Sequence, residues 1–184
     1  MRPFNYAGWL VKRCLWNTSL AVLTVGFFSG VAASESTLVG VASVIDGDTI
    51  EIHGHRVRLF GIDAPESGQL CRGGDSLQYR CGSAAANKLG EFIGRRTVSC
   101  TRSEHDRYGR IVGKCSVDET DLAEWLVRNG YALDWPKYSK GRYAAQQASA
   151  TAEERGMWAG SFVIPWRYRE CMRGGGIVVA CSDQ

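Results

Sequence analysis

The chain has 184 residues, of which 45% are hydrophobic and 22% are charged, a composition that fits a folded globular protein and excludes a disordered chain. The formal net charge is +3, but the three charged residues among the first 33 are all basic, and without them 19 basic residues face 19 acidic ones. General electrostatic attraction to a polyanion is therefore excluded, and nucleic-acid binding would need a local basic cluster or a bound metal ion.

Residues 1–33 have the layout of a secretory signal peptide. Arg2, Lys12 and Arg13 precede an apolar run from Cys14 to Phe28, and Val31-Ala32-Ala33 places small residues at a cleavage position. An uncleaved anchor helix is the alternative, but the run is shorter than the roughly 20 residues that a bilayer requires. We expect cleavage after Ala33 and export to the periplasm or the medium, with no stable membrane association afterwards.

Three short strands are predicted between residues 38 and 62, where apolar and polar residues alternate. Asp46-Gly47 is a strong tight-turn signal, so residues 41–45 and 49–53 should form a hairpin, followed by a third strand at 56–62.

This meander would bring Asp48, Asp63 and Glu66 to neighbouring strand ends, with Arg58 directed toward them. Carboxylates that converge without enough lysines to neutralise them need a cation, and an oxygen-rich cluster suits calcium or magnesium. Taken singly, each of these residues is also common in ordinary turns, caps and surface ion pairs.

The remaining pattern predicts a loop at 67–82, helices at 83–93, 120–129 and 143–155, and strands at 97–100 and 111–117. A glycine directly follows each helix (Gly94, Gly130 and Gly156), as is common at helix C-termini. Five short strands with inserted helices suit a small closed barrel, although other α+β folds fit the same pattern. Residues 165–169 interleave aromatic and basic side chains, and we expect them to pack across the barrel rather than bind nucleic acid.

Six cysteines follow the leader, and an even number in an exported domain favours disulfide bonds. We predict sequential pairing, although other connectivities stay open: Cys71–Cys81, Cys100–Cys115 and Cys171–Cys181. The middle pair has the strongest basis, because both of its residues lie on strands that flank one hairpin. A zinc site is disfavoured, because no CxxC or HxxxH spacing occurs.

Three motifs resemble, in order and in approximate spacing, those of the staphylococcal nuclease family: IDGDT at 45–49, RLFGIDAPE at 58–66 and DRYGR at 106–110. One motif alone would be weak, whereas three in sequence are specific. The resemblance runs from about Leu38 to Arg169 and implies an α+β, mainly β fold, a five-stranded OB-fold barrel with three helices. We expect a nuclease domain at 34–170 and a disulfide-closed tail at 171–184.

The resemblance implies a calcium site formed by Asp48, Asp63 and the backbone carbonyl of Ala64. Family members often have threonine at the position of Ala64, but a carbonyl ligand does not depend on the side chain. Few protein oxygens imply an open site, with room for a substrate phosphate.

The resemblance also implies the catalytic residues Arg58, Glu66 and Arg110. A carboxylate such as Glu66 can orient or deprotonate an attacking water, and the two guanidinium groups match the oxygens of a phosphorane-like transition state.

Substrate contacts are expected from Arg107, Tyr108, Trp135 and Tyr138. Arg107 stands where the family has a lysine, and Pro136 replaces an expected tyrosine, for which we expect Trp135 to substitute by stacking on bases.

The sequence thus predicts a monomeric, exported, Ca²⁺-dependent nuclease that cleaves DNA and RNA, prefers single strands and leaves 3′-phosphate ends. Sequence-specific cutting is not expected, because nothing in the sequence resembles a groove-reading helix. One alternative is a catalytically silent barrel that binds nucleic acid or protein. A disulfide-rich structural protein is another, but it would leave the arginine–carboxylate set without a purpose.

Overall fold

The structure is a computed structural model that describes residues 37–182. The predicted signal peptide lies outside these residues, so its cleavage stays a prediction. The strands are β1 (Thr37–Asp46), β2 (Thr49–Ile52), β3 (His55–Leu59), β4 (Ile62–Asp63), β5 (Leu70–Arg72), β6 (Gln78–Arg80), β7 (Thr97–His105), β8 (Ile111–Val117), β9 (Thr120–Asp121) and β10 (Leu133–Asp134). The helices are α1 (Cys81–Ile93), α2 (Leu122–Arg128), α3 (Pro136–Ser139), α4 (Ala144–Ala152), α5 (Pro165–Arg173) and α6 (Val178–Cys181), with a 3-10 turn η1 (Gly156–Ala159). Within this described part, every helix is too short or too polar to cross a membrane.

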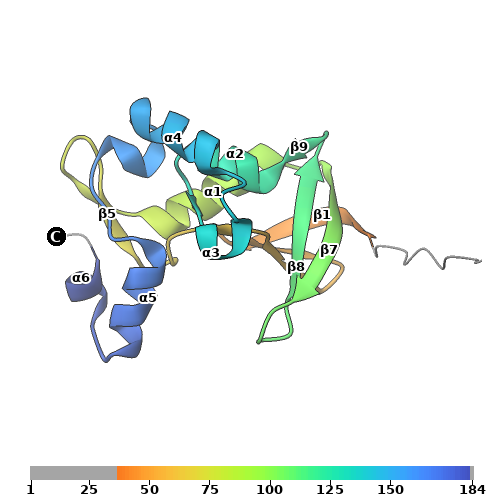
Figure 1. Cartoon of the computed structure of the whole chain (residues 1–184), viewed down its shortest axis with the longest axis horizontal. Coiled ribbons are helices and arrows are strands. Elements are labelled where there is room, and N and C mark those ends of the chain that lie inside the picture. Colours follow the sequence, from red (N-terminus) through yellow and green to blue (C-terminus); the bar gives the residue numbers. More distant parts are fainter. Residues whose placement is uncertain (1–36, 183–184) are drawn as a thin grey trace, which may run out of the picture. The chain divides into compact units, whose positions relative to one another are not determined.

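Five strands close into a barrel, which confirms the predicted OB-fold architecture. The order is β3-β2-β1-β7-β8 with antiparallel neighbours, and a parallel pairing of β3 with β8 joins the two edges. In Figure 1, the long strands β7 and β8 lie at one side of the molecule, with α1 and α2 beside the barrel. Closure leaves few free sheet edges, so the barrel is a rigid support for the loops that follow its strands.

The predicted hairpin at Asp46-Gly47 is present. Strands β1 and β2 pair with Asp46 opposite Thr49, and the Asp48 backbone N–H donates to the Asp46 side chain at 3.0 Å. The side chains of β2 and β3 alternate, so that Ile50, Ile52, Val57 and Leu59 fill the barrel interior. Residues of opposite parity, including Arg58, are therefore left at the outer face of the strand.

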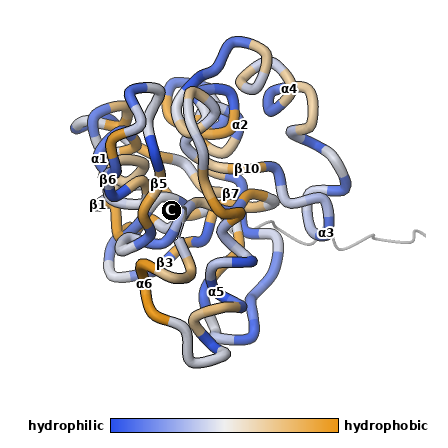
Figure 2. Tube along the Cα trace, turned by 90° about the vertical axis from the view of Figure 1, so that its left-hand side faces the viewer, coloured by the Kyte–Doolittle hydropathy of each residue, from blue (hydrophilic) through white to orange (hydrophobic). Residues whose placement is uncertain are grey.

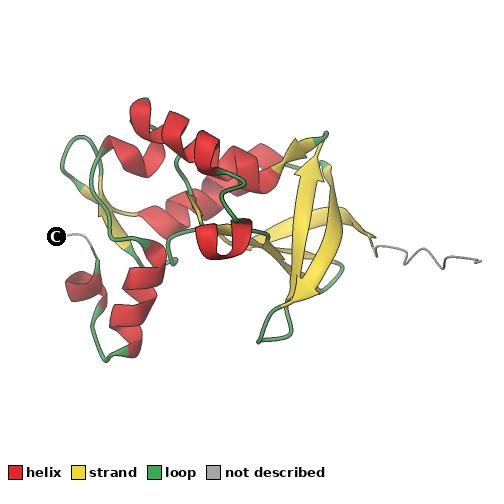
Figure 3. Cartoon of the chain, viewed as in Figure 1, coloured by secondary structure: helices red, strands yellow, loops and turns green. Residues whose placement is uncertain are grey.

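Apolar side chains from the helices complete the main core. The buried helical members are Leu89, Ile93, Leu122, Ala123, Leu126 and Val127. A second, smaller core surrounds the Cys71–Cys81 bond and includes Leu133 and Met157. Figure 3 shows the helices in red gathered at one side and the long barrel strands in yellow at the other.

The three predicted helices are present as α1, α2 and α4, with different starts. Helix α1 begins at Cys81 rather than Ser83, because the Ser83 hydroxyl donates to the Ser67 carbonyl at 2.9 Å instead of capping the helix. Helix α2 begins after Asp121, whose side chain accepts hydrogen bonds from the N–H groups of Ala123 and Glu124. The described residues add the short helices α3 and α6, and helix α5, which the sequence pattern did not indicate.

Three strand predictions differ from the structure. The third strand, predicted at 56–62, ends at Leu59 as β3, and residues 62–63 form the separate strand β4, because they pair with β10 instead. The segment predicted as a loop at 67–82 contains a small hairpin, β5 with β6. Strand β7 continues to His105, five residues beyond the predicted end at Cys100, because β8 pairs with it along this length. Residues 102–105 are exposed, so their sequence carries no alternation that could reveal the strand.

All three predicted disulfides are present. Cys100 and Cys115 face each other directly in the β7–β8 ladder, and Cys71–Cys81 closes the β5–β6 hairpin onto α1. Cys171–Cys181 joins α5 to α6. In Figure 2, the trace of α5 is mostly hydrophilic, whereas α6 is hydrophobic, so the disulfide joins a polar helix to an apolar one.

Candidate active site

Arg58 joins two buried aspartates beside the first hairpin. Asp48 lies in the β1–β2 turn, and Asp63 ends the short strand β4. The β2–β3 register puts Arg58 opposite Thr49, next to Asp48. Its Nη2 lies 2.7 Å from Asp48 Oδ2 and 2.8 Å from Asp63 Oδ1. The structure therefore brings together these three residues, which the sequence had placed near one another.

Both aspartates are buried, and the Asp63 side chain has no exposed surface. Burial raises the pKa of Asp48 to about 7, although the charge of Arg58 acts in the opposite direction. Burial also raises the pKa of Asp63 above its ordinary value, against hydrogen bonds and charge from Arg169 and the charge of Arg58. These carboxylates thus depend on positive partners to remain ionised.

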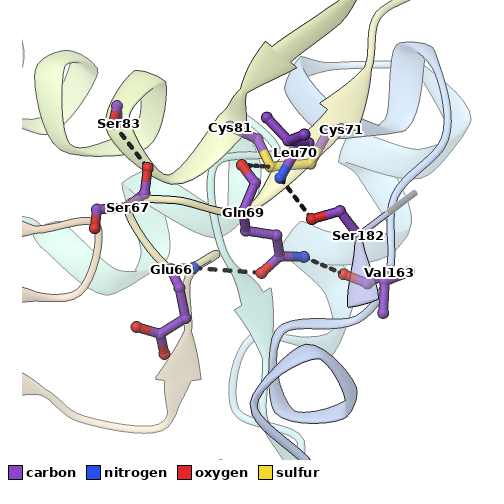
Figure 4. Close-up of a disulfide and its surroundings, with 9 residues drawn as sticks. All are labelled: Glu66, Ser67, Gln69, Leu70, Cys71, Cys81, Ser83, Val163 and Ser182. Carbon is purple, nitrogen blue, oxygen red and sulfur yellow. Dashed lines mark hydrogen bonds between the residues drawn. A yellow bond between two sulfur atoms is a disulfide. The ribbon is translucent and has the colours of Figure 1, made fainter. Parts of the chain in front are cut away.

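Glu66 lies at the rim of this cluster, on the loop after β4. Its side chain is 43% exposed, so the carboxylate is open to solvent water. Gln69 fixes the loop, because its Oε1 accepts from the Glu66 backbone N–H at 3.3 Å and its Nε2 donates to the Val163 carbonyl at 2.6 Å (Figure 4). Gln69 is fully buried, and the sequence analysis did not single it out, because its role depends on a partner 94 residues away.

Helix α1 approaches the same loop at Gly82. A Cβ atom at this position would lie 2.0 Å from the Glu66 carbonyl oxygen and 2.5 Å from the Pro65 carbonyl oxygen. No side chain fits in that space, so glycine allows the start of α1 to pack against the backbone that carries Glu66.

Arg169 of α5 completes the cluster, and the sequence analysis missed it as a site residue. Its Nη1 and Nη2 donate to the two oxygens of Asp63 at 2.9 and 2.7 Å, and Nη1 also donates to Glu66 Oε1 at 3.0 Å. Burial lowers the pKa of Arg169, but the bonds to Asp63 and Glu66 outweigh burial and raise that pKa above its ordinary value. The interleaved aromatic and basic residues at 165–169 were the available signal.

The DRYGR segment forms the turn between β7 and β8. Asp106 accepts hydrogen bonds from the backbone N–H groups of Tyr108 and Arg110 at 2.9 and 3.0 Å, and from Arg110 Nε at 2.7 Å. Gly109 has φ of +77°, the left-handed conformation that this tight turn requires. The guanidinium carbons of Arg107 and Arg110 lie 4.9 and 5.7 Å from the centre of the Tyr108 ring.

One cavity of about 730 Å³ brings these two clusters to a common space. The predicted residues that line it are Asp48, Arg58, Ala64, Glu66, Arg107, Tyr108, Arg110, Trp135 and Tyr138. Asp63 alone among the predicted site residues does not line it. Arg58 and Arg169, both hydrogen-bonded to Asp63, are the groups that face the cavity instead.

Aromatic side chains form one wall of the cavity. Trp135 contacts Tyr138 edge to face at 4.5 Å between ring centroids and stacks on Trp166 at 5.7 Å. Tyr138 and Tyr108 are 44% and 70% exposed, so much of each side chain is open to solvent. The predicted substrate-binding residues therefore lie at the same opening, and their role in binding stays a prediction.

The carboxylate oxygens of Asp48 and Asp63 are ligands of the kind that a hard divalent cation prefers. One nitrogen, Arg58 Nη2, contacts an oxygen of each aspartate, so the two carboxylates are close enough to share a positive partner. The Ala64 N–H donates to Asp48 Oδ2 at 3.2 Å. Ala64, whose carbonyl is the third predicted ligand, therefore lies beside the aspartates. Among residues 37–182, no group of three or more His, Cys, Asp or Glu side chains could hold a metal ion, and the ligand set of Asp48, Asp63 and the Ala64 carbonyl stays a prediction.

A closed five-stranded barrel whose cavity is lined by arginines and carboxylates defines the class of OB-fold proteins with a site for phosphate esters. Residues 56–160 match the family described as staphylococcal nuclease homologue. The chain belongs to this family, and several of its relatives are named as nucleases.

Three relatives illustrate the range of the similarity. The succinoglycan biosynthesis protein ExoI of Rhizobium meliloti is 41% identical over 140 residues, which cover 75% of this chain and 73% of the relative. An uncharacterized endonuclease of Escherichia coli is 32% identical over 139 residues, covering 71% and 84%. The micrococcal nuclease of Shigella flexneri is 30% identical over 150 residues, covering 72% and 80%.

Proposed function

We propose that this chain is an exported, Ca²⁺-dependent nuclease that acts as a monomer, hydrolyses phosphodiester bonds of DNA and RNA without sequence specificity, and leaves 3′-phosphate ends. The observation that carries the proposal is the single cavity shared by Arg58, Glu66 and Arg110. Two guanidinium groups and a solvent-accessible carboxylate are suited to the attack of water on a phosphodiester. The names of the endonuclease and micrococcal nuclease relatives support the same activity.

Each residue has a distinct task in this reaction. Glu66 orients a water molecule and takes its proton as the water oxygen bonds to phosphorus and the bond to the 5′-oxygen breaks. Arg58 and Arg110 neutralise the charge that gathers on the phosphate oxygens, and one of them assists the departing 5′-oxygen. Asp48, Asp63 and the Ala64 carbonyl would hold Ca²⁺, which would supply further stabilisation of the negative charge on the phosphate.

The aromatic wall supports a preference for single strands. Unpaired bases can stack on the exposed faces of Tyr108 and Tyr138, and such stacking tolerates any base. Arg107 beside Tyr108 adds positive charge for the backbone of the same strand.

The test is a cleavage assay on the disulfide-bonded protein with single-stranded DNA, duplex DNA and RNA, in Ca²⁺, Mg²⁺, Mn²⁺ or chelator. Because the Rhizobium relative is named for succinoglycan biosynthesis, an acidic polysaccharide belongs in the substrate panel.

Glu66→Gln removes the proton acceptor, and Glu91→Gln on α1, an exposed glutamate paired with Lys88, is the matched control. Products with 3′-phosphates have free 5′-hydroxyl ends, which accept a radioactive phosphate from polynucleotide kinase without prior dephosphorylation.

We expect Ca²⁺-dependent cutting that Glu66→Gln lowers by a factor of about 100 or more, with Glu91→Gln at the wild-type rate. A folded wild-type protein that cuts no nucleic acid with any of these ions would exclude the nuclease. Gel-shift binding by such an inactive protein would identify the silent binding module instead.

A further inference from the structure

The most extensive set of charged contacts in the cavity belongs to a residue outside the three family motifs. The guanidinium of Arg169 takes both oxygens of Asp63 in a fork, at 2.9 and 2.7 Å, and reaches Glu66 at 3.0 Å. It therefore bridges a predicted cation ligand and the predicted water-activating carboxylate. A forked, charge-assisted contact of this kind is strong and directional.

Helix α5 holds Arg169 in this place from several sides. Tyr168 is buried, Trp166 stacks on Trp135, and the Arg169 guanidinium lies 5.4 Å from the centre of the Trp135 ring. The Val163 carbonyl, just before the helix, accepts a hydrogen bond from buried Gln69. The helix backbone is thus packed against the core on several sides, and Arg169 reaches Asp63 through its long side chain.

The C-terminal end of the same segment is fastened as well. Cys171, two residues after Arg169, is bonded to Cys181, and the adjacent Ser182 hydroxyl accepts a hydrogen bond from the Leu70 backbone N–H at 3.0 Å (Figure 4). Arg169 consequently belongs to a segment that is anchored to the core at both ends.

A cation and the Arg169 fork compete for the same oxygens. Asp63 has two carboxylate oxygens, and both accept from Arg169, while Oδ1 also accepts from Arg58. A carboxylate offers about four lone pairs, and these N–H groups use three of those on Asp63, so a cation that binds at the usual distance of about 2.4 Å competes with them for Oδ1 and for the crowded Oδ2. Arg58 contacts both aspartates, whereas Arg169 contacts Asp63 but not Asp48. Arg169 can therefore leave without removing the positive partner of Asp48.

We propose that Arg169 is a positioning residue of this site that competes with the divalent cation for Asp63 and so sets the cation affinity from the C-terminal helix. The inference rests on the proposed function, because it assumes that the cation binds Asp48 and Asp63. The contact with Glu66 keeps the displaced guanidinium beside the cavity. Its charge also lowers the local excess of negative charge that Asp48, Asp63 and Glu66 create around Arg58, which weakens cation binding further.

The test is calorimetric titration of CaCl₂ into the disulfide-bonded wild-type protein, Arg169→Gln and Arg167→Gln. Arg167 is the matched control, because it lies on the same helix, is 69% exposed and pairs with Glu170. Removing one positive charge and the fork should lower the Kd of Arg169→Gln for Ca²⁺ by a factor of about 10. Arg167→Gln should keep the wild-type Kd, and an Arg169→Gln protein with the wild-type Kd or a higher one would overturn the proposal.

Arg169→Lys is a second variant that keeps the proposal testable if Arg169→Gln does not fold. Lysine keeps the charge but cannot form the fork, so its Kd should fall between those of the wild type and Arg169→Gln. If circular dichroism shows Arg169→Gln to be unfolded, an Arg169→Lys protein that binds Ca²⁺ no more tightly than the wild type refutes the competition.

A second readout observes the side chain itself. The guanidinium NMR signals of Arg169, identified by their loss in the variant, should shift when CaCl₂ is added. Signals that stay unchanged while calorimetry reports binding would refute the displacement. If neither the wild type nor the variants bind Ca²⁺, the proposed cation dependence fails, whereas Ca²⁺ binding by the wild type without a gain in Arg169→Gln defeats this inference alone.

Discussion

The close approach of α1 to the Glu66 backbone offers a sharp test through two glycines of that helix. In Gly82→Ala, the new Cβ would lie 2.0 Å from the Glu66 carbonyl oxygen and 2.3 Å from its carbon. In Gly90→Ala, two turns further along the same helix, the nearest atom is a methyl group of Val44 at 3.8 Å, an ordinary contact. The same substitution thus overlaps backbone atoms at one position and makes an ordinary van der Waals contact at the other.

The two substitutions should change the free energy of unfolding in opposite directions. Carbon and oxygen do not approach below about 3 Å, so Gly82→Ala must move the start of α1 and the Glu66 backbone apart by about 1 Å. Such overpacking should lower the free energy of unfolding by about 2 kcal/mol. Displacing a catalytic group by about 1 Å should lower kcat by a factor of about 100. Gly90→Ala should instead raise the free energy of unfolding by up to about 1 kcal/mol, because alanine favours the helix, and leave kcat unchanged.

Urea unfolding and single-stranded DNA cleavage, measured on both variants under the same conditions, check this pair of expectations. The linear-extrapolation slope should stay at the wild-type value, which shows that the folded state is equally compact. A Gly82→Ala protein with wild-type stability and wild-type kcat would refute the argument that the α1–Glu66 contact positions the site.

Two further predictions concern the barrel and the aromatic wall. Replacing both Cys100 and Cys115 by serine should lower the free energy of unfolding by about 3 kcal/mol, as expected for a closed loop of 15 residues, and a urea midpoint equal to that of the oxidised wild type would contradict this. Tyr108→Ala should weaken binding of single-stranded DNA by about 1–3 kcal/mol while changing stability by less than about 0.5 kcal/mol, because the side chain is 70% exposed. Fluorescence anisotropy in the presence of chelator measures that affinity, and an unchanged Kd would remove Tyr108 from the binding surface.

The barrel was predictable because its signals are local. Asp46-Gly47 marks the first hairpin, and the buried residues of β2 and β3 alternate in the sequence as they do in the structure. The β5–β6 hairpin was not predicted, since each of its strands has only three residues and its stability comes from the Cys71–Cys81 bond and the neighbouring core rather than from alternation.

The same distinction holds for the site. Asp48 and Arg58 meet because one hairpin register places them together, and a reader of the sequence can follow that register. Arg169 reaches Asp63 across 106 residues, through the packing of a helix that no periodicity announced. Gln69 depends in the same way on the distant carbonyl of Val163. Contacts between residues so far apart in the sequence depend on tertiary packing, which the pattern of a single sequence does not show.

The parallel pairing of β3 with β8 determines when the candidate site is assembled in a newly made chain. It sets Arg58 opposite Val112, two residues after Arg110, so the two predicted phosphate-binding arginines meet only once the barrel has closed. Joining segments about 50 residues apart carries a loop-closure cost that is recovered only when the surrounding core forms. A nascent or partly folded chain therefore has the separate motifs but no assembled centre, and any hydrolysis that the protein performs begins with its native state.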